Sequence, residues 1–235
     1  MGYLDGLGAE ALSVLGWWQE AGVDTLVEDA PRDWLARAPS AAPASAEAPA
    51  APVPAALPKT REALIAWLAD AANLPALGPR RIAPAGDPAS ALMILADMPD
   101  PDDRETLFEG RAGQLFDAIL AAISMDRSSI YLAALCPARP AGGRLAAEIA
   151  APLAEAARAH VAAVAPKALL LFGREAGAAF GLSAAPGRRN LQSVNHSRGT
   201  TAAIVTHHPR MMIGQPARKA DAWADISALI GEMKR

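Results

Sequence analysis

The chain has 235 residues, is 52% hydrophobic and carries a net charge of −3 at pH 7. This length supports one good-sized core with an appendage, and no run reaches the roughly 18 apolar residues that span a membrane. The single cysteine, Cys136, excludes a disulfide within the chain and a metal cluster held by several of its thiolates. The mild net negative charge argues against nonspecific binding along nucleic acid but is compatible with a local basic groove.

Residues 1–37 place apolar side chains at helical spacing between acidic ones, which predicts one or two short amphipathic helices. Two interpretations of Trp17 and Trp18 fit equally: they dock on a protein partner, or they pack on the rest of the chain. The opening sequence lacks the basic start and apolar centre of a secretion signal, so we expect a cytoplasmic protein without membrane contact. Residues 38–58 are mostly alanine and proline, which predicts a disordered linker before a domain at 59–235.

Within this domain, helical and strand patterns alternate. We expect helices over residues 60–72, 113–123, 145–164, 174–180 and 217–233, and strands over 91–96, 130–135, 168–172 and 202–206. The stretch 182–200 is expected to be irregular and basic, and the closing helix is expected to turn Trp223 inward. Alternation of this kind implies parallel strands with right-handed crossovers, so the predicted fold is a three-layer α/β/α sandwich around a four-stranded parallel sheet.

The topology places the carboxyl ends of all four strands along one edge of the sheet. That edge collects Asp97 after the first strand, Arg139 beyond the second, Gly173 after the third and His208 after the fourth. Ligand sites in open parallel sheets lie at this edge. We therefore expect these residues, which are far apart in the sequence, to face one cleft.

Each candidate side chain also has a purely structural interpretation. Asp97 orients a water or stabilises a cation, or else it caps its loop. His208 donates a hydrogen bond to a developing anion, or it is a structural hydrogen-bonder beside the functional His207. Phe108 stacks on a planar ligand, or it fills the core. The scattered basic residues contact phosphates, or they are solvated surface: Arg188, Arg189, Arg198, Arg210 and Lys219.

The motifs in this order resemble those of the uracil-DNA glycosylase superfamily, most closely its family-four bacterial members. The strongest stretch is FEGRAGQLFDAILAAISMDRSSIYLAAL, residues 108–135, against a family pattern of F-V-G-R-A-G-Q-L-L-D, then L-A-A-I-G-L-D-R and Y-I-T-N. Further agreement comes from Arg139-Pro140, from the LFG that ends the third strand, and from HHPRMMIGQPARKADAWADI against H-P-x-x-L-L and K-x-x-A-W-x-D.

The resemblance implies hydrolysis of the N-glycosidic bond of deoxyuridine in DNA, with the base flipped out of the stack into a pocket. Phe108 matches the phenylalanine that stacks on the flipped base. His208 matches the histidine that hydrogen-bonds the uracil oxygen, and Asp97 falls where the family has a glutamate. Met98 and Ala134 complete the expected base-binding residues. The arginines expected to contact DNA are Arg139, Arg188, Arg189 and Arg210.

The sequence departs from the family pattern in three places. The first motif, G-E-x-P-G in the family, reads Ala-Asp-Met-Pro-Asp at residues 96–100, which puts the acidic Asp100 where a glycine is expected. The asparagine that reads the uracil edge is replaced by Ala134. Alanine cannot make that hydrogen bond. The four-cysteine iron–sulfur site is absent, because Ala138 takes one position, Pro152 lies near another and Cys136 is out of register; no cofactor is expected.

Two functions remain open on these observations. The chain is a glycosylase of altered or broad specificity that removes uracil or another deaminated base, using Asp97, Phe108 and His208. Alternatively, it is a catalytically degenerate paralogue that keeps the scaffold and acts as a DNA- or protein-binding module.

Overall fold

The computed structural model describes residues 13, 14, 16–18, 20, 21, 57, 58, 60–70, 72–74, 77 and 80–235. Ser13, Val14, Gly16, Trp17, Trp18 and Glu20 are helical and exposed. Apart from Ala21, the rest of the predicted N-terminal segment and the predicted linker up to residue 56 lie outside the described residues. Within the described part of the chain, no helix has the length and apolarity to cross a membrane.

A six-stranded sheet in the order β1-β3-β2-β4-β6-β5 forms the centre of the domain. The predicted parallel core is confirmed in four neighbouring strands: β3 (Tyr131–Ala134), β2 (Leu92–Ala96), β4 (Ala168–Phe172) and β6 (Gly199–Thr206). Every residue of β2 and β4 is buried, as expected of parallel strands covered on both faces. Short antiparallel strands close the two edges: β1 (Ala85–Gly86) and β5 (Gln192–His196).

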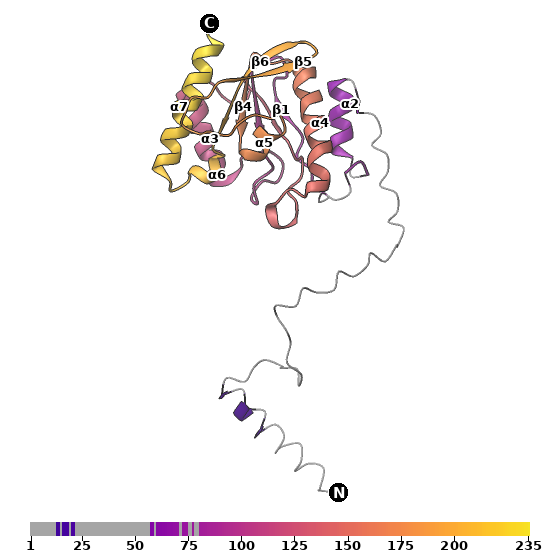
Figure 1. Cartoon of the computed structure of the whole chain (residues 1–235), viewed down its shortest axis with the longest axis vertical. Helices are drawn as coiled ribbons and strands as arrows, with labels where there is room; N and C mark the ends of the chain where they lie inside the picture. Colours follow the sequence, from indigo (N-terminus) through magenta and orange to yellow (C-terminus); the bar gives the residue numbers. More distant parts are fainter. Residues whose placement is uncertain are drawn as a thin grey trace, which may run out of the picture. The chain divides into compact units, whose positions relative to one another are not determined.

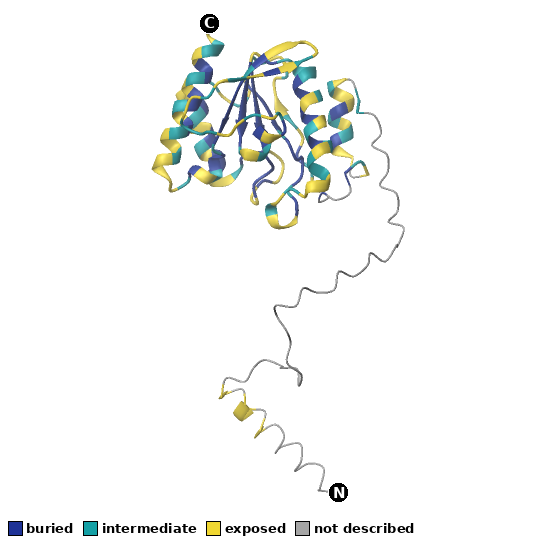
Figure 2. Cartoon of the chain, viewed as in Figure 1, coloured by how far each residue is buried: buried dark blue, intermediate teal, exposed yellow. Residues whose placement is uncertain are grey.

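Helices cover both faces of the sheet, so the three-layer sandwich is confirmed (Figure 1). One face packs on α2 (Arg61–Ala69), α4 (Ala147–Val164) and α5 (Arg174–Ala178), and the other on α3 (Gly110–Ala122) and α7 (Pro216–Met233). Successive strand residues alternate between the two cores, with Met93 and Leu95 in the first and Leu92 and Ile94 in the second. Figure 2 shows the buried strands between helices whose outer sides are exposed.

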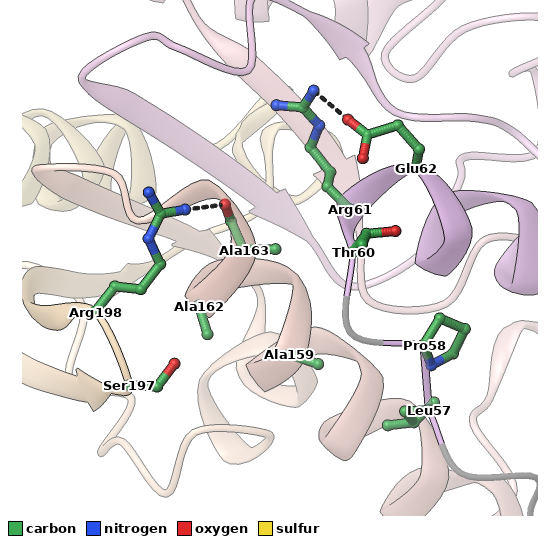
Figure 3. A pocket seen from close by; sticks show the side chains of 10 residues that line it. All are labelled: Leu57, Pro58, Thr60, Arg61, Glu62, Ala159, Ala162, Ala163, Ser197 and Arg198. Carbon is green, nitrogen blue, oxygen red and sulfur yellow. Dashed lines mark hydrogen bonds and ion pairs between the residues drawn. The ribbon is translucent and has the colours of Figure 1, made fainter.

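Local sequence signals account for several element boundaries. The predicted cap Thr60 accepts a 3.3 Å hydrogen bond from the Ala63 amide at the start of α2. Helix α4 ends at Val164, and its cap residue Ala165 has a left-handed backbone conformation. Pro166 follows, a position where proline is common after a helix end. Arg198, on the turn between β5 and β6, donates a 2.8 Å hydrogen bond to the Ala163 carbonyl at the end of α4 (Figure 3).

Two expectations about individual elements were wrong. Residues 182–200 are not wholly irregular, because β5 and the start of β6 form a hairpin there. Strand β5 was not predicted because it is a polar edge strand with one buried residue, Val194. Trp223 is 47% exposed and is not part of the hydrophobic core, while Ile226 and Ile230 supply the buried stripe of α7. A short helix, α6 (Pro209–Met212), follows His208 in a segment for which no element was predicted.

A buried histidine links α4 to β3. The Nε2 atom of His160 lies 2.8 Å from the Tyr131 hydroxyl, and His160 is 2% exposed. Burial lowers the pKa of His160 to about 4, against about 6.5 in an unfolded chain. As pH falls from 6.5 to 4, the unfolded chain therefore takes up a proton that the native chain does not, and stability is lost.

We predict that His160→Gln reduces this loss of stability at low pH. Glutamine preserves a hydrogen bond to Tyr131 but does not titrate, so the decline in the free energy of unfolding between pH 6.5 and 4 should shrink by up to about 3 kcal/mol. Urea unfolding across this pH range measures the effect. An unchanged slope contradicts the assignment of a neutral, buried His160.

Candidate active site at the carboxyl edge of the sheet

A cavity of about 720 Å³ opens where β2, β4 and β6 end. The cavity brings together three of the four residues predicted to share this edge, Asp97, Gly173 and His208. Met98, His207 and Arg210 also line it. The fourth predicted residue, Arg139, lies instead beside a smaller hollow of about 250 Å³, which it shares with Asp100.

Asp97 is fixed by the backbone that follows β2. Its amide donates to the Phe172 carbonyl of β4, and its own Oδ1 atom accepts a 2.8 Å hydrogen bond from the Met98 amide. The carboxylate lies against Gly173, where a Cβ atom would come within 2.8 Å of Oδ2. Gly173 also has a φ of +104°, which non-glycine residues rarely adopt. Glycine at this turn therefore leaves the space that Asp97 occupies.

The guanidinium of Arg210 bridges two buried carboxylates. Its Nη2 atom donates to Asp97 Oδ2 at 2.8 Å, and its Nη1 atom donates to Asp100 Oδ1 at 3.0 Å. Burial raises the pKa of both carboxyls, and the Arg210 charge opposes that rise. The sequence assigned Arg210 to DNA phosphates. In the structure, its guanidinium is engaged with these two side chains, and sequence reasoning missed both pairs.

His208 is a buried imidazole at the start of α6. Its side chain is 1% exposed and caps α6, where Nδ1 accepts a hydrogen bond from the Arg210 amide at 3.2 Å. Its Nε2 atom lies 3.3 Å from Arg210 Nη1 and 3.6 Å from Asp97 Oδ1, so both ring nitrogens lie close to N–H groups of Arg210. Burial, and then the charges of Arg210 and Arg139, lower the pKa of His208 well below its ordinary value.

The ring of Phe108 lies next to this imidazole, with 5.1 Å between the ring centroids. It stacks on Phe116 at 4.5 Å and meets Phe172 edge-to-face at 5.8 Å. Phe108 is only 1% exposed. Its packing therefore places it beside the catalytic candidates but leaves almost none of its surface open to the cavity.

Arg127 holds the loop that carries Phe108, and sequence reasoning gave it no role. Its Nη1 and Nη2 atoms donate to the carbonyls of Leu107 and Phe108 at 2.8 and 2.7 Å. Gly113 lets the loop approach α3, because a Cβ there would collide with the Phe108 carbonyl. The aspartate–arginine pair at 126–127, which the resemblance includes, was the available signal for this contact.

The remaining predicted residues are dispersed. Ala134 is half-buried at the end of β3 and packs against the core on the α3 and α7 side. Arg139 donates to the Pro99 carbonyl at 3.0 Å. Arg188 and Arg189 are exposed and do not line the cavity; the backbone amide of Arg189 donates to the buried Asp225 in α7.

The segment compared with the family's iron–sulfur cysteines is packed into the hydrophobic core. Cys136 and Ala138 are fully buried in the same apolar cluster as Leu74, Leu77 and Leu153. The Cys136 thiol donates to the Ala138 carbonyl, and burial raises the pKa of the thiol to about 11. One cysteine in the whole sequence does not fit a four-cysteine cluster. Among the described residues, no group of three histidine, cysteine or acidic side chains could hold a metal ion.

We predict that Arg210→Met destabilises the domain because it leaves Asp97 and Asp100 buried without their cation. The free energy of unfolding at pH 7 should fall by about 2–3 kcal/mol, less than for a fully buried pair because the Arg210 side chain is 26% exposed. Protonation of the carboxyls relieves the defect, so the loss should be smaller at pH 4.5. Urea unfolding at both pH values measures it, and equal losses contradict the ion-pair account.

Two comparisons with known proteins bear on this site. The family model described as the uracil DNA glycosylase superfamily matches residues 83–227, which run from β1 through most of α7. A search of curated proteins found no match. The matched range contains all the strands of the sheet and all the residues that line the cavity of about 720 Å³. Because this match covers more than half of the chain, the chain belongs to the uracil DNA glycosylase superfamily.

Proposed function

We propose that this protein is a DNA-repair glycosylase, most like the family-four enzymes, which acts in the cytoplasm and hydrolyses the N-glycosidic bond of a flipped, damaged base. One observation carries the proposal: Asp97, Phe108 and His208, from three separate parts of the chain, converge beside a cavity of about 720 Å³. Family membership supports action on DNA.

Asp97 is the candidate for stabilising the sugar cation and accepting a proton from water. A carboxylate close to C1′ stabilises the positive charge that develops as the base leaves. The Met98 amide and the Arg210 guanidinium fix the orientation of this carboxylate before substrate binds. Preorganisation of this kind avoids reorganisation during the reaction.

His208 is the candidate for contact with the departing base. Its Nε2 atom lies 3.3 Å from Arg210 Nη1 and 3.6 Å from Asp97 Oδ1. In the proposed role, Nε2 carries the ring proton and donates a hydrogen bond to the base, while Nδ1 accepts from the Arg210 amide. A neutral donor stabilises charge on the leaving group without transferring its proton. Phe108, Met98 and Ala134 would surround the base, and Arg139, Arg188, Arg189 and Arg210 are the candidates for contact with DNA phosphates.

A second function is favoured by the same region of the structure. A base that stacks on Phe108 needs an uncovered ring face, yet Phe108 is 1% exposed, and Arg210 ties Asp97 to Asp100. These observations support a paralogue that keeps the scaffold, binds DNA or protein and does not hydrolyse the glycosidic bond.

The N-terminal segment is the candidate for a contact with a protein partner. Trp17 and Trp18 are 65% and 47% exposed, and their rings lie edge-to-face at 6.1 Å. Exposed tryptophans are strong anchors at protein interfaces. A partner retained by a peptide of residues 1–37, but not by the same peptide carrying Trp17→Ala and Trp18→Ala, would identify this contact. Equal retention would exclude the tryptophans from it.

We predict that His208→Ala lowers kcat/KM about 10²–10³-fold, because it removes the donor to the leaving base. The assay is base release from oligonucleotides that carry uracil, hypoxanthine or xanthine, followed by alkaline cleavage of the abasic strand. His207→Ala is the control, because His207 lines the same cavity and has no role in the proposed chemistry, so its activity should stay within a few-fold of wild type.

Undiminished turnover of the His208 variant removes this residue from the mechanism. A wild-type protein that releases none of these bases, yet binds DNA with an affinity that falls steeply with salt, is the result expected of the noncatalytic paralogue.

We predict that Ala134→Asn increases the ratio of kcat/KM for uracil to that for cytosine by at least about tenfold, because an amide at this strand end would read the base edge. Competition between uracil- and cytosine-bearing oligonucleotides measures this ratio. No change means that position 134 does not face the base. Ala134→Val is the matched control for added bulk, and it should leave the ratio unaltered.

A further inference from the structure

The backbone at Phe108 has a conformation that phenylalanine rarely adopts. Its φ is +60°, in the left-handed region that is an outlier for a bulky side chain. Such a conformation persists only where the surrounding structure imposes it, and residues held in this way gather at functional sites. Contacts around Phe108 must therefore stabilise this conformation.

The guanidinium of Arg127 makes two of these contacts. Its Nη1 and Nη2 atoms donate to the carbonyls of Leu107 and Phe108, at 2.8 and 2.7 Å. These carbonyls belong to the two peptide groups on either side of the Phe108 Cα atom. One rigid, planar group therefore restrains both backbone dihedral angles of Phe108.

The same guanidinium is anchored on α3. Its Nε atom donates to Asp117 Oδ1 at 2.7 Å, and its Cζ atom lies 5.2 Å from the centroid of the Phe116 ring. Phe116 is the ring on which Phe108 stacks. Arg127 therefore fixes the backbone of Phe108 relative to the helix that carries its stacking partner.

The position of the Phe108 ring decides where a flipped base can stack. Phe116 covers one face of the ring, with 4.5 Å between the centroids and 27° between the planes, so a base can stack only on the opposite face. The centroids of Phe108 and His208 are 5.1 Å apart. A shift of Phe108 therefore changes the distance between the two groups expected to hold the base, and a misplacement of about 1 Å can lower a rate about 100-fold.

We propose that Arg127 is a positioning residue for base removal, which acts by holding Phe108 in its left-handed conformation with the face opposite Phe116 directed toward the flipped base. The proposal rests on the glycosylase function proposed above. It gives a reason for the strained backbone at Phe108 and for the paired hydrogen bonds that Arg127 donates to the flanking carbonyls. Without those bonds, Phe108 would relax to an ordinary backbone conformation and its ring would move.

The first test replaces Arg127 by lysine, which keeps the positive charge but lacks the planar pair of donors. The substrate is whichever oligonucleotide of the uracil, hypoxanthine and xanthine set the wild-type protein cleaves fastest. With protein in excess over DNA, the single-turnover rate of base release should fall at least about tenfold. Affinity for the same DNA should stay within about twofold, because the proposed contacts of Arg127 are to protein carbonyls and not to phosphates. An unchanged rate, or a loss explained entirely by weaker DNA binding, overturns the proposal.

Asp117→Asn is the matched control. It removes the charge that faces Arg127 Nε and leaves both carbonyl contacts in place, so the single-turnover rate should stay within about twofold of wild type. Equal losses in Asp117→Asn and Arg127→Lys would assign the effect to the ion pair and overturn the proposal.

A double-mutant cycle tests whether Arg127 acts through Phe108. Phe108→Leu removes the aromatic face and keeps an apolar side chain in the core. In this background, Arg127→Lys should lower the rate by less than about twofold, because the ring that Arg127 positions is already absent. Losses that multiply in the double variant show that Arg127 acts elsewhere and overturn the proposal.

A second measurement reports the position of the ring without any reaction. With 4-fluorophenylalanine at position 108, the ¹⁹F resonance of the free protein should move in Arg127→Lys by more than its linewidth and stay in place in Asp117→Asn. Arg127→Gln, which also removes the planar pair of donors, is the second variant and should move the resonance likewise. A resonance that stays in place in both Arg127 variants overturns the proposal.

These measurements separate failure of this inference from failure of the proposed function. A wild-type protein that releases a base, with an Arg127→Lys variant that releases it equally fast, overturns the role of Arg127 and leaves the glycosylase intact. Release of no base by the wild-type protein overturns the glycosylase and the role of Arg127 in it, and the ¹⁹F resonance then still shows whether Arg127 holds the ring.

Discussion

The interaction on which the site depends is the bridge from Arg210 to Asp97 and Asp100. It joins the loop after β2 to the helix after β6, which are separated by more than 100 residues of sequence. Buried carboxylates are tolerated only when they are paired or well hydrogen-bonded. The bridge therefore sets the position of Asp97, and through the α6 cap it also sets the position of His208.

The same bridge explains why the site lends itself to two functional interpretations. It orients the carboxylate, and burial together with the Arg210 charge lowers the pKa of His208 and keeps the imidazole neutral; both features suit glycosidic bond cleavage. It also engages the Arg210 guanidinium with two carboxylates, and Phe108 stays packed in an aromatic cluster. A productive complex requires DNA to uncover Phe108 while Asp97 and His208 keep their orientation.

Much of the fold could be predicted from the sequence, because its signals are local. Apolar runs such as Leu92–Ala96 and Ala168–Phe172 have few alternatives to a buried strand, and their alternation with helices fixes a parallel sheet. Strand β5 could not be found this way, since it depends on pairing with β6 and has one buried side chain. Trp223 was misjudged because the apolar stripe of α7 is complete without it.

Site residues could be predicted where the strand topology determines their position, but not where side-chain packing determines it. Parallel strand ends placed Asp97, Gly173 and His208 at one cavity. No local pattern distinguishes an arginine that binds phosphate from one that bridges two buried acids, so the partners of Arg210 were missed. The burial of Phe108 against Phe116 likewise follows from packing, which the sequence order does not reveal.

The measurement that tests the central claim most directly is a crystal structure of the protein bound to duplex DNA containing a damaged 2′-fluoronucleotide, which resists hydrolysis. The account predicts an extrahelical base stacked on Phe108, with His208 Nε2 within hydrogen-bond distance of the base and Asp97 facing C1′. A complex in which the base stays in the helix, with Phe108 still enclosed and Arg210 still bridging both aspartates, would contradict it.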